Sequence, residues 1–333
     1  MSTTVAAYQL VETDEGVRGR HTRIPLEDLG EGDVLIRVTH SSVNYKDGLA
    51  ATGRAPIAHR LPLVGGCCAA GTVVEPGKSG VPADTVVAVV GATLSEQHNG
   101  GYCEYLRVPA AWVVAVPEAF TSRQAAAIGT AGVTSAMAVV KLEDAGVTPE
   151  SGPIAVTGAS GGAGSLAVAL LAARGYEVTA LTGKPEAEDL LRDLGAANVA
   201  PRPDTSGTRP LERGTWAGAV DTVGGDTLAW LTRTVAPGGS IAAFGNAGGN
   251  RLTTTVLPFI LRGINLLGVT VTFPAAELRE RVWELLASSL SREALDAIAT
   301  DVDFEDLDDA LRRIVTTGVV GRQVVRIGGE AAV

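Results

Sequence analysis

The sequence has 333 residues and a formal net charge of −10, with 46% hydrophobic and 19% charged residues. This composition is typical of a folded globular protein and not of a disordered chain, and the length predicts two domains. The acidic balance argues against nucleic acid and anionic membranes as partners, because binding to either requires a basic surface.

The first residues, MSTTVAAYQLVETDEG, contain neither the basic start nor the apolar core of a signal peptide. No apolar run approaches the length of about 18 residues that a membrane span requires. The cysteines at Cys67, Cys68 and Cys103 are too few and too unevenly placed for a disulfide framework, which indicates a reducing compartment. We therefore expect a cytoplasmic protein with no membrane partner.

Residues 1 to about 125 have the pattern of strands and turns. The segment DVLIRVTHSSVNY alternates apolar and polar residues, GTVVE and TVVAVVG are short β-branched runs, and prolines interrupt GGYCEYLRVPAAWVVAVP. These patterns predict a β-rich domain. From about Ser122, the alanine-rich segment SRQAAAIGTAGVTSAMAVVKLEDAG has helical spacing and closes on a glycine, as helices often do.

Beyond this helix, apolar strands alternate with helices from GPIAVTG and AGSLAVALLAARG to INLLGVTV. This alternation predicts a doubly wound parallel sheet of the α/β class, because only a sheet covered on both sides buries both faces of each strand. The remaining chain predicts the helices PAAELRERVWELLASSL and FEDLDDALRRIVTTG and a last strand, GRQVVRIGG.

The segment IAVTGASGGAGSLAVALLAARGYEVTALTGK contains a glycine-rich loop between a strand and a helix, with a second strand after it. Backbone amides of Ser160, Gly161, Gly162 and Ala163 should meet the helix N-terminus there and bind a pyrophosphate. The order strand, loop, helix and strand is the context that a dinucleotide motif requires. A tight strand-to-helix turn without a ligand is the alternative.

The end of the second strand indicates which dinucleotide binds. An NAD site usually has an acidic residue there for the ribose hydroxyls, whereas this chain has Thr182, Gly183 and Lys184. A hydroxyl, a glycine and a cation suit a 2′-phosphate, and Arg202 after the next short strand could add a guanidinium group. The prediction is NADPH, and the alternative is that Lys184 is a solvated surface lysine.

A β-rich first domain, the helix GTAGVTSAMAVVKLEDAGVTP, the loop TGASGGAGS and a C-terminal return resemble the medium-chain dehydrogenase/reductase superfamily. Within it, SSVNYKDGLAATG, WAGAVDTVGG, TTTVLPFILRGINLLGV and GRQVVRI resemble the acrylyl-CoA reductase group, also described as YhdH-type quinone oxidoreductases. The resemblance implies a GroES-like catalytic domain over residues 1–125 and a Rossmann NADPH-binding domain over 126–265. Residues 266–333 would return to complete the Rossmann edge and the catalytic domain.

The metal ligands of the zinc members are missing from this sequence. By resemblance, Asn44 replaces a zinc-binding cysteine, and Cys67 and Cys68 replace the His and Glu of those members. Two adjacent thiols alone cannot enclose a tetrahedral ion. We therefore expect no metal, so charge that develops in the reaction must be stabilised by protein donors and the nicotinamide pocket.

The resemblance places the segment VNYKD beside the nicotinamide, with Asn44 and Tyr45 facing the cofactor. Reduction of an activated C=C bond leaves an enolate that needs hydrogen bonds and a proton, and both side chains can donate. Tyr45 is the first candidate for orienting the nicotinamide or supplying the proton. Water as the proton source and a tyrosine that only packs at a strand end are the alternatives. Lys46 and Asp47 are expected to be a structural pair or a helix start.

The resemblance implies further cofactor contacts. Thr130 should lie under the cofactor at a helix start, Asn246 and Ile260 should lie on the nicotinamide side, and Arg322 should reach the phosphates. The complete set of predicted cofactor-binding residues is Tyr45, Thr130, Ser160, Gly161, Gly162, Ala163, Thr182, Gly183, Lys184, Arg202, Asn246, Ile260 and Arg322.

These patterns and the resemblance together predict NADPH-dependent reduction of acryloyl-CoA to propionyl-CoA by hydride transfer to the β-carbon, without a metal. One alternative is reduction of quinones or small enones and enals that carry no CoA. Another, of a different class, is an NADPH-binding sensor or structural protein with little turnover. The resemblance also implies a homodimer that pairs the edge strand INLLGVTV of two chains, an edge that would otherwise be prone to aggregation.

Cys67 and Cys68 stand where nearer zinc-free relatives commonly have an aliphatic residue and Asp. Because neighbours on a strand point to opposite faces, one thiol is expected to face the active-site cleft and the other the core. Cys68, at the position of the Asp, is the expected cleft residue and a candidate for redox sensitivity. The alternative is that both are small buried filler.

Overall fold

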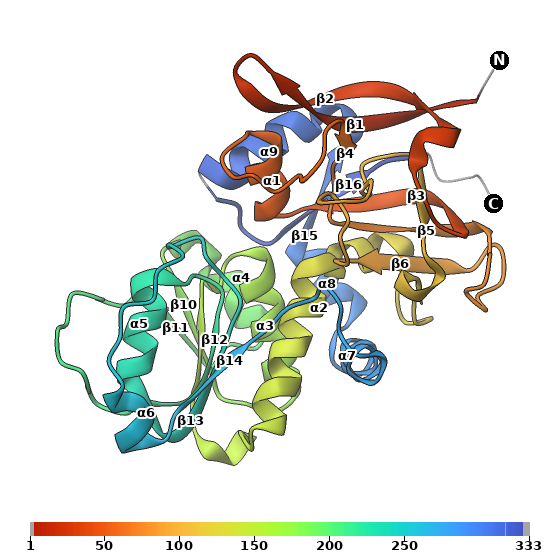
Figure 1. The fold of residues 1–333 in the computed structure, drawn as a ribbon. Helices are drawn as coiled ribbons and strands as arrows, with labels where there is room; N and C mark the ends of the chain where they lie inside the picture. The colour runs from red at the N-terminus through yellow and green to blue at the C-terminus, as the bar shows by residue number, and fades with distance from the viewer. Residues whose placement is uncertain (1–2, 317, 329–333) are drawn as a thin grey trace. The chain divides into compact units, whose positions relative to one another are not determined.

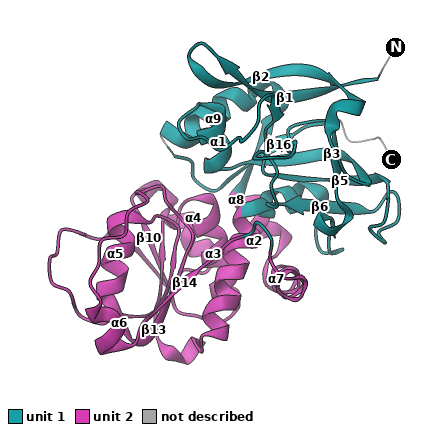
Figure 2. Cartoon of the chain, viewed as in Figure 1, with its two compact units in different colours: residues 1–130, 271–273, 299–333 teal, residues 131–270, 274–298 magenta. Residues whose placement is uncertain are grey.

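The computed structural model describes residues 3–316 and 318–328, which fall into two compact units (Figures 1 and 2). Unit 1 holds the chain up to Thr130, the short stretch Val271–Phe273, and the chain from Ala299 onward. Unit 2 holds Ala131–Thr270 and Pro274–Ile298. The chain passes from unit 1 to unit 2 at Thr130, whereas the sequence places the boundary at residue 125.

Unit 1 is built on two sheets, with the strand orders β2-β1-β4 and β15-β16-β3-β5-β6-β8, and β7 also pairs with β3. Every pair is antiparallel except β15 with β16, so residues 1–125 form the β-rich domain that alternation predicts. The strands are β1 (Thr4–Thr13), β2 (Gly16–Pro25), β3 (Val34–Val43), β4 (Leu63–Val64), β5 (Cys68–Glu75), β6 (Val86–Val90), β7 (Tyr105–Val108), β8 (Val114–Ala115), β15 (Ala299–Asp303) and β16 (Arg322–Arg326).

Two helices of unit 1, α1 (Tyr45–Ala51) and α9 (Leu307–Thr316), pack against each other. Helix α1 lies within the part of the chain that reads as strands and turns, and its seven residues are too few to show a helical period in the sequence. Strand β16 pairs with β3 next to this helix, so the end of the chain completes the sheet that carries the start of α1. Short 3₁₀ helices cover Leu26–Leu29, Ala110–Trp112 and Phe304–Asp306.

Unit 2 is a six-stranded parallel sheet with the order β11-β10-β9-β12-β13-β14 (Figure 1). The order reverses direction between β9 and β12, which is the topological switch point where doubly wound sheets bind their ligands. This confirms the predicted α/β class. The strands are β9 (Ile154–Thr157), β10 (Val178–Thr182), β11 (Asn198–Pro201), β12 (Trp216–Asp221), β13 (Val235–Ala243) and β14 (Asn265–Gly268).

The helices of unit 2 confirm the pattern of strands alternating with helices, and α7 and α8 both contact α3. They are α3 (Gly162–Ala173), α4 (Glu188–Asp193), α5 (Gly225–Thr234), α6 (Leu257–Arg262), α7 (Ala276–Ser289) and α8 (Arg292–Ile298). Two 3₁₀ helices cover Pro149–Ser151 and Pro185–Ala187.

Helix α2 (Ser122–Asp144) is the long alanine-rich helix that the sequence predicts, and it contains a kink at Gly129. Its length and composition would suffice to cross a membrane, but 83% of its apolar window is buried inside the fold. Such burial is typical of the core helix of a globular protein. Gly129 has φ 43° and ψ −152°, a conformation that glycine adopts far more readily than other residues, and it divides the helix just before the change of unit.

Candidate functional site

The glycine-rich loop of unit 2 connects the end of β9 to the start of α3. Gly161 is the N-cap of α3, and its amide donates to the carbonyl oxygen of Gly158 at 2.9 Å. A Cβ on Gly164 would lie 2.2 Å from the same oxygen, so only glycine lets the first turn of the helix approach the loop. The loop and the helix N-terminus with Gly162 and Ala163 form a ready anion site at the switch point of the sheet.

The end of β10 lies beside this loop, as the sequence predicts. Thr182 Oγ1 donates to Ser160 Oγ at 2.8 Å and accepts a hydrogen bond from the amide of Lys184 at 3.1 Å. A Cβ on Gly183 would lie 2.3 Å from Arg202 Nε, so the guanidinium group rests over this glycine. Gly183 and Arg202 are exposed and Lys184 is half-buried. The cationic side chains of Lys184 and Arg202 therefore lie next to Gly183, which has no side chain. Together they form a donor set that fits a phosphate.

A buried carboxyl group, which sequence reasoning missed, holds the neighbouring strand ends together. Asp221 ends β12 and is 0% exposed. It accepts hydrogen bonds from Thr157 Oγ1 at 2.6 Å and from the amide of Gly224 at 2.8 Å. Burial raises the pKa of Asp221, and these donors oppose that effect. An Asp directly after an apolar strand and before a glycine pair is the signal that could have identified it.

Of the remaining predicted residues of unit 2, one lies near the loop end of the sheet and one does not. Asn246 is exposed in the segment after β13, and its Cα would lie 3.2 Å from a Cβ on Gly224. Ile260 is 67% exposed on α6. Arg262 of the same helix donates to the carbonyl oxygen of Val235, the first residue of β13, at 2.9 Å. Helix α6 therefore lies by the amino end of β13, away from the carboxyl ends that carry the loop, and the structure does not bring Ile260 to the other predicted residues.

In unit 1, Asn44 is the N-cap of α1 and the centre of a polar cluster. Its amide nitrogen Nδ2 lies within hydrogen-bond distance of three acceptors that share its two hydrogen atoms: the carbonyl oxygen of Ser42 at 3.0 Å, Asp47 Oδ2 at 2.9 Å and Cys67 Sγ at 3.2 Å. Its backbone amide also donates to Asp47 Oδ2, at 3.1 Å. The sequence interpretation of Asp47 as a helix-start carboxylate agrees with this geometry. The donors of Asn44 are thus engaged within the protein.

Asp47 is a buried carboxyl group, 3% exposed. Its Oδ1 accepts a hydrogen bond from the backbone amide of Cys67 at 3.0 Å, and Cys67 Sγ donates to its Oδ2 at 3.4 Å. Burial raises the pKa of Asp47, while hydrogen bonds from Asn44 and Cys67 act in the opposite direction. Of the two alternatives expected for Lys46 and Asp47, the helix start agrees with the structure, and the ammonium group of Lys46 forms an ion pair with Glu96.

Arg322 joins the cluster from β16 and is 3% exposed. Its Nη1 donates to Asn44 Oδ1 at 3.1 Å, its Nη2 to Ser42 Oγ at 2.6 Å, and its Nε to the carbonyl oxygen of Ala127 at 2.8 Å. The sequence prediction directs Arg322 to the cofactor phosphates, but this guanidinium group is occupied inside unit 1. One of these hydrogen bonds holds the side-chain oxygen of Asn44.

The two adjacent thiols lie on this cluster, and both are 1% exposed. Cys67 Sγ contacts Asn44, Asp47 and Thr130 Oγ1, the last at 3.4 Å, and Cys68 Sγ lies 3.0 Å from Ser42 Oγ. Both thiols are buried, which agrees with the alternative of small buried filler, and both sulfur atoms contact this one cluster instead of opposite faces. Strand β5 begins only at Cys68, so the alternation of strand side chains does not apply to Cys67.

Tyr45 and Thr130 are both half-buried. Tyr45 is the first residue of α1, directly after the anchored Asn44. Thr130 Oγ1 donates to the carbonyl oxygen of Cys67 at 3.3 Å. A Cβ on Gly129 would lie 2.7 Å from Ser42 Oγ, so the glycine kink lets α2 approach the cluster. Tyr102, which the sequence analysis did not select, donates to the carbonyl oxygen of Ser42 at 3.1 Å.

These side chains do not fit a zinc ion. The cluster combines an amide, a guanidinium group, two adjacent thiols and one carboxyl group, and it contains no imidazole. Across residues 3–316 and 318–328, no group of three or more His, Cys, Asp and Glu side chains is arranged to hold a metal ion. A tetrahedral zinc site needs such a set of ligands.

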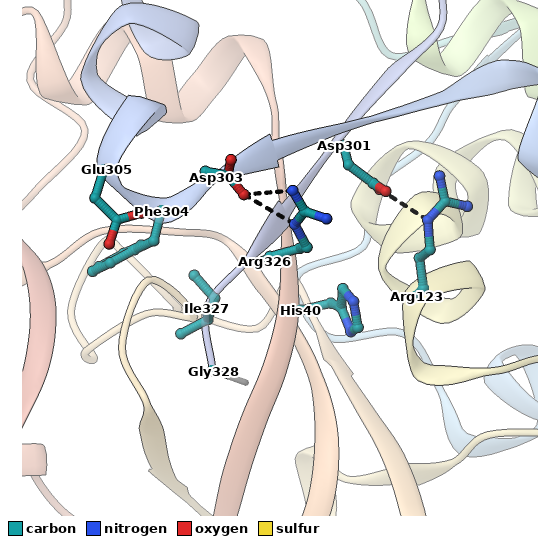
Figure 3. Close-up of a pocket in the computed structure, with 9 residues that line it drawn as sticks. All are labelled: His40, Arg123, Asp301, Asp303, Phe304, Glu305, Arg326, Ile327 and Gly328. Atoms are coloured by element: carbon teal, nitrogen blue, oxygen red, sulfur yellow. Dashed lines mark hydrogen bonds and ion pairs between the residues drawn. The ribbon is translucent and has the colours of Figure 1, made fainter. Parts of the chain in front are cut away.

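A separate pocket of about 500 Å³ opens on unit 1 near the ends of β15 and β16 (Figure 3). Figure 3 shows the guanidinium groups of Arg123 and Arg326 turned toward Asp301 and Asp303, with which they form ion pairs. None of its lining residues belongs to the predicted site. They are His40, Arg123, Asp301, Asp303, Phe304, Glu305, Arg326, Ile327 and Gly328.

Comparisons with known proteins agree with both units. Residues 30–118 match the alcohol dehydrogenase GroES-like domain, and residues 162–288 match the zinc-binding dehydrogenase family. The chain is 43% identical over 307 residues to the acrylyl-CoA reductase AcuI of Ruegeria pomeroyi, covering 92% of this chain and 93% of the relative. It is 40% identical to YhfP of Bacillus subtilis, named provisionally as a quinone oxidoreductase, over 98% of this chain and all of the relative.

A solved structure is also similar over nearly the whole chain. The structure of Escherichia coli K-12 YhdH with bound NADPH has a TM-score of 0.94 and 40% sequence identity, and it covers 97% of this chain and 100% of that chain. The β-rich unit, the parallel sheet with its glycine loop, and these relatives agree with one another. The chain therefore belongs to the medium-chain dehydrogenase/reductase superfamily, in the group of the acrylyl-CoA reductases and YhdH-type quinone oxidoreductases, and it is an oxidoreductase.

Proposed function

We propose that this oxidoreductase uses NADPH to reduce the C=C bond of acryloyl-CoA, giving propionyl-CoA. The choice of NADPH as the cofactor is supported by the donor set of unit 2, in which Lys184 and Arg202 flank Gly183 beside the glycine loop. A 2′-phosphate would satisfy both cations, whereas an NAD site usually has a carboxylate at this place. The substrate is supported by the 43% identity to an acrylyl-CoA reductase.

The predicted cofactor contacts form two sets. Ser160, Gly161, Gly162, Ala163, Thr182 and Gly183 would hold the pyrophosphate and the adenosine ribose together with Lys184 and Arg202, and Asn246 would lie toward the nicotinamide. Tyr45 and Thr130 of unit 1 are proposed as further contacts. NADPH, when bound, supplies a hydride to the β-carbon of the substrate. The protein must then stabilise negative charge on the thioester oxygen and allow a proton to reach the α-carbon.

The unit 1 cluster supports different roles for Asn44 and Tyr45. The two hydrogen atoms of Asn44 Nδ2 are shared among three partners and its Oδ1 accepts from Arg322, so a further donation to substrate would break an existing hydrogen bond. We therefore assign Asn44 to positioning α1. Tyr45 follows it with a half-buried side chain, and we propose its hydroxyl as the donor to the enolate. Donors held rigidly before the reaction stabilise such charge best.

A homodimer is proposed from the exposed edge of unit 2. Strand β14 is the last strand of its sheet, and Leu266 on it is 37% exposed. At α6, Val256, Ile260 and Leu261 are 66%, 67% and 63% exposed. An apolar edge of this kind is prone to uncontrolled pairing unless a partner covers it. Sedimentation should give twice the chain mass, and Ile260→Asp should give a monomer; a monomeric unmodified protein would contradict the proposal.

The second candidate is reduction of quinones or small enones, which the 40% identity to YhfP favours. A sensor with little turnover is the third, and a cytoplasmic location is proposed for all of them. The test is a screen of acryloyl-CoA, crotonyl-CoA and quinones, each with NADPH and with NADH, in which oxidation of the nicotinamide is followed by its absorbance. We expect the highest kcat/KM for acryloyl-CoA with NADPH. A preference for quinones would support the second candidate, and turnover with no substrate would support a sensor.

A further inference from the structure

Cys67 and Cys68 form a pair of adjacent thiols to which the proposed reduction assigns no step. Both lie on the cluster around Asn44, but their sulfur atoms have different partners. Cys68 lies on the side of a guanidinium group, and Cys67 lies on the side of a carboxyl group. Unequal surroundings of this kind give two neighbouring thiols different proton affinities and therefore different reactivities.

The surroundings of Cys68 favour its thiolate form. Arg322 Nη2 donates to Ser42 Oγ at 2.6 Å, which leaves the hydroxyl hydrogen of Ser42 available to Cys68 Sγ at 3.0 Å. Hydrogen bonding with the Cys67 thiol, whose single hydrogen atom is shared between Asp47 and Cys68, has the largest effect on the pKa of Cys68. With the contributions of Ser42 and the charge of Arg322 it outweighs burial and lowers this pKa to about 6. This shift favours the thiolate, the nucleophilic form of cysteine, at Cys68.

The surroundings of Cys67 keep its proton in place. Its sulfur donates to Asp47 Oδ2 at 3.4 Å, and the carboxyl group also accepts the backbone amide of Cys67 at 3.0 Å. The hydrogen bond with Cys68, followed by burial and the charge of Asp47, raises the pKa of the Cys67 thiol. A protonated thiol thus stands beside a thiolate. The Cys67 thiol can react with the Cys68 sulfur once the Cys68 sulfur is oxidised.

Two half-buried residues contact the Cys67 thiol. Asn44 Nδ2 lies 3.2 Å from Cys67 Sγ, and Thr130 Oγ1 lies 3.4 Å from it. Both side chains are partly exposed, whereas the two thiols are 1% exposed and Gly129 is buried. Access of an oxidant to the buried thiols therefore requires these side chains to move.

We propose that Cys67 and Cys68 are a peroxide-sensitive dithiol whose oxidation to a disulfide between adjacent residues reversibly inhibits this protein. The Cys68 sulfur attacks one oxygen of hydrogen peroxide, so that an S–O bond forms, the O–O bond breaks, and the leaving hydroxide takes up a proton as water. The Cys67 sulfur then attacks the Cys68 sulfur, the S–O bond breaks, and a second water leaves. Two thiols lose two electrons and two protons to one peroxide.

The disulfide would disturb the start of α1. Cys67 would lose the proton that it donates to Asp47, and both Asp47 and the Cys67 sulfur are hydrogen-bonded to Asn44. Because Tyr45 follows Asn44 directly, the proposed donor moves with this contact. We expect turnover to fall by about 10-fold or more, since small displacements of a reacting group reduce rates strongly. This consequence rests on the proposed function, so the experiment also measures the oxidation state of the two thiols directly.

The experiment treats the full chain with hydrogen peroxide and follows thiol content, intact mass and turnover over the same time course. The expected product has lost two thiols and two hydrogen atoms, and peptide mapping places the bond between Cys67 and Cys68. Dithiothreitol should restore both thiols and turnover. The control is Cys103→Ala, since burial raises the pKa of Cys103 to about 11 and its thiol should not take part. This variant should behave like the unmodified protein.

Two variants separate the roles of the thiols. Cys68→Ala should slow oxidation of Cys67 about 10-fold or more, because no thiolate remains to attack the peroxide. Cys67→Ala should gain oxygen at Cys68 without forming a disulfide. The proposal is overturned if Cys68→Ala oxidises as fast as the unmodified protein, or if the native chain keeps both thiols. If the disulfide forms and the turnover of a reduced substrate does not change, the proposed inhibition is overturned, while the proposed oxidation of the two thiols stands. If a variant does not fold, peptide mapping of the unmodified chain decides.

Discussion

Arg322 Nη1 donates a hydrogen bond to Asn44 Oδ1 over a distance of 3.1 Å, which ties strand β16 to the N-cap residue of α1. Replacing Arg322 with Met should lower kcat without a matching rise in the KM for NADPH, because Asn44 loses the partner that fixes its amide. The matched control is Arg326→Met on the same strand, which removes an exposed arginine paired with Asp303 and should leave kcat unchanged. Equal effects of the two variants would contradict this positioning role.

Tyr45→Phe tests the proposed donor to the enolate. Loss of one preorganised donor typically lowers kcat by about 10²-fold to 10³-fold, and we expect an effect of that size. The matched control is Tyr105→Phe on β7, another half-buried tyrosine of unit 1. Steady-state rates with acryloyl-CoA measure both variants. If Tyr45→Phe retains full kcat and full affinity for NADPH, Tyr45 has no part in the reaction.

Lys184→Ala and Arg202→Ala test the contacts to the 2′-phosphate. Each charge-assisted hydrogen bond contributes about 1.5–3 kcal/mol, so each variant should weaken binding of NADPH about 10-fold to 100-fold. Binding of NADH, which lacks this phosphate, should not change. Fluorescence titration with both nucleotides measures the difference, and Arg209→Ala in an exposed loop is the control. A parallel loss for NADPH and NADH would argue against a phosphate site here.

The ionisation of Cys68 gives a prediction of pH dependence. Its pKa in the folded protein is about 6, below the ordinary 9.0, so the thiolate persists near neutral pH and is lost as the pH falls through about 6. Ultraviolet absorbance of the thiolate should follow this course and should be missing in Cys68→Ala. The preferred thiolate also stabilises the fold above the unfolded pKa, and this contribution declines as the pH falls toward about 6. A titration midpoint near 9 would contradict the assignment.

Asp221→Ala should destabilise unit 2. Three donors lose their acceptor, namely Thr157 Oγ1 and the amides of Val223 and Gly224. Leaving such buried donors unpaired costs about 3 kcal/mol, measured as the free energy of unfolding in urea. Asp221→Asn retains one oxygen acceptor and should lose less. Equal losses for the two variants would show that the carboxyl oxygens are not the cause.

The parts of the site that the sequence predicted are close together along the chain or meet at strand ends. Ser160 and Thr182 follow β9 and β10, which are neighbouring parallel strands, and the carboxyl ends of such strands lie at one edge of the sheet. Their hydrogen bond could be expected for that reason. The same reasoning brought Lys184 and Arg202 to this edge, because β11 is the next strand.

The parts that the sequence did not predict depend on long-range packing. Arg322 and Asn44 are 278 residues apart, and no local period shows that β16 lies against β3. The directions of the Cys67 and Cys68 side chains were predicted from strand alternation. Strand β5 begins at Cys68, so Cys67 lies outside the strand and the alternation does not apply to it. Ile260 was placed by resemblance alone, and the bonds of Arg262 show that its helix lies at the other end of β13.

The most direct measurement of the proposed reaction follows the transferred hydrogen. Acryloyl-CoA is incubated with the protein and with NADPH that carries deuterium at the transferred position of the nicotinamide, and the product is examined by nuclear magnetic resonance. The proposal predicts propionyl-CoA with deuterium at the β-carbon and a solvent-derived hydrogen at the α-carbon. Deuterium at the α-carbon, or a product that contains no deuterium, would contradict it.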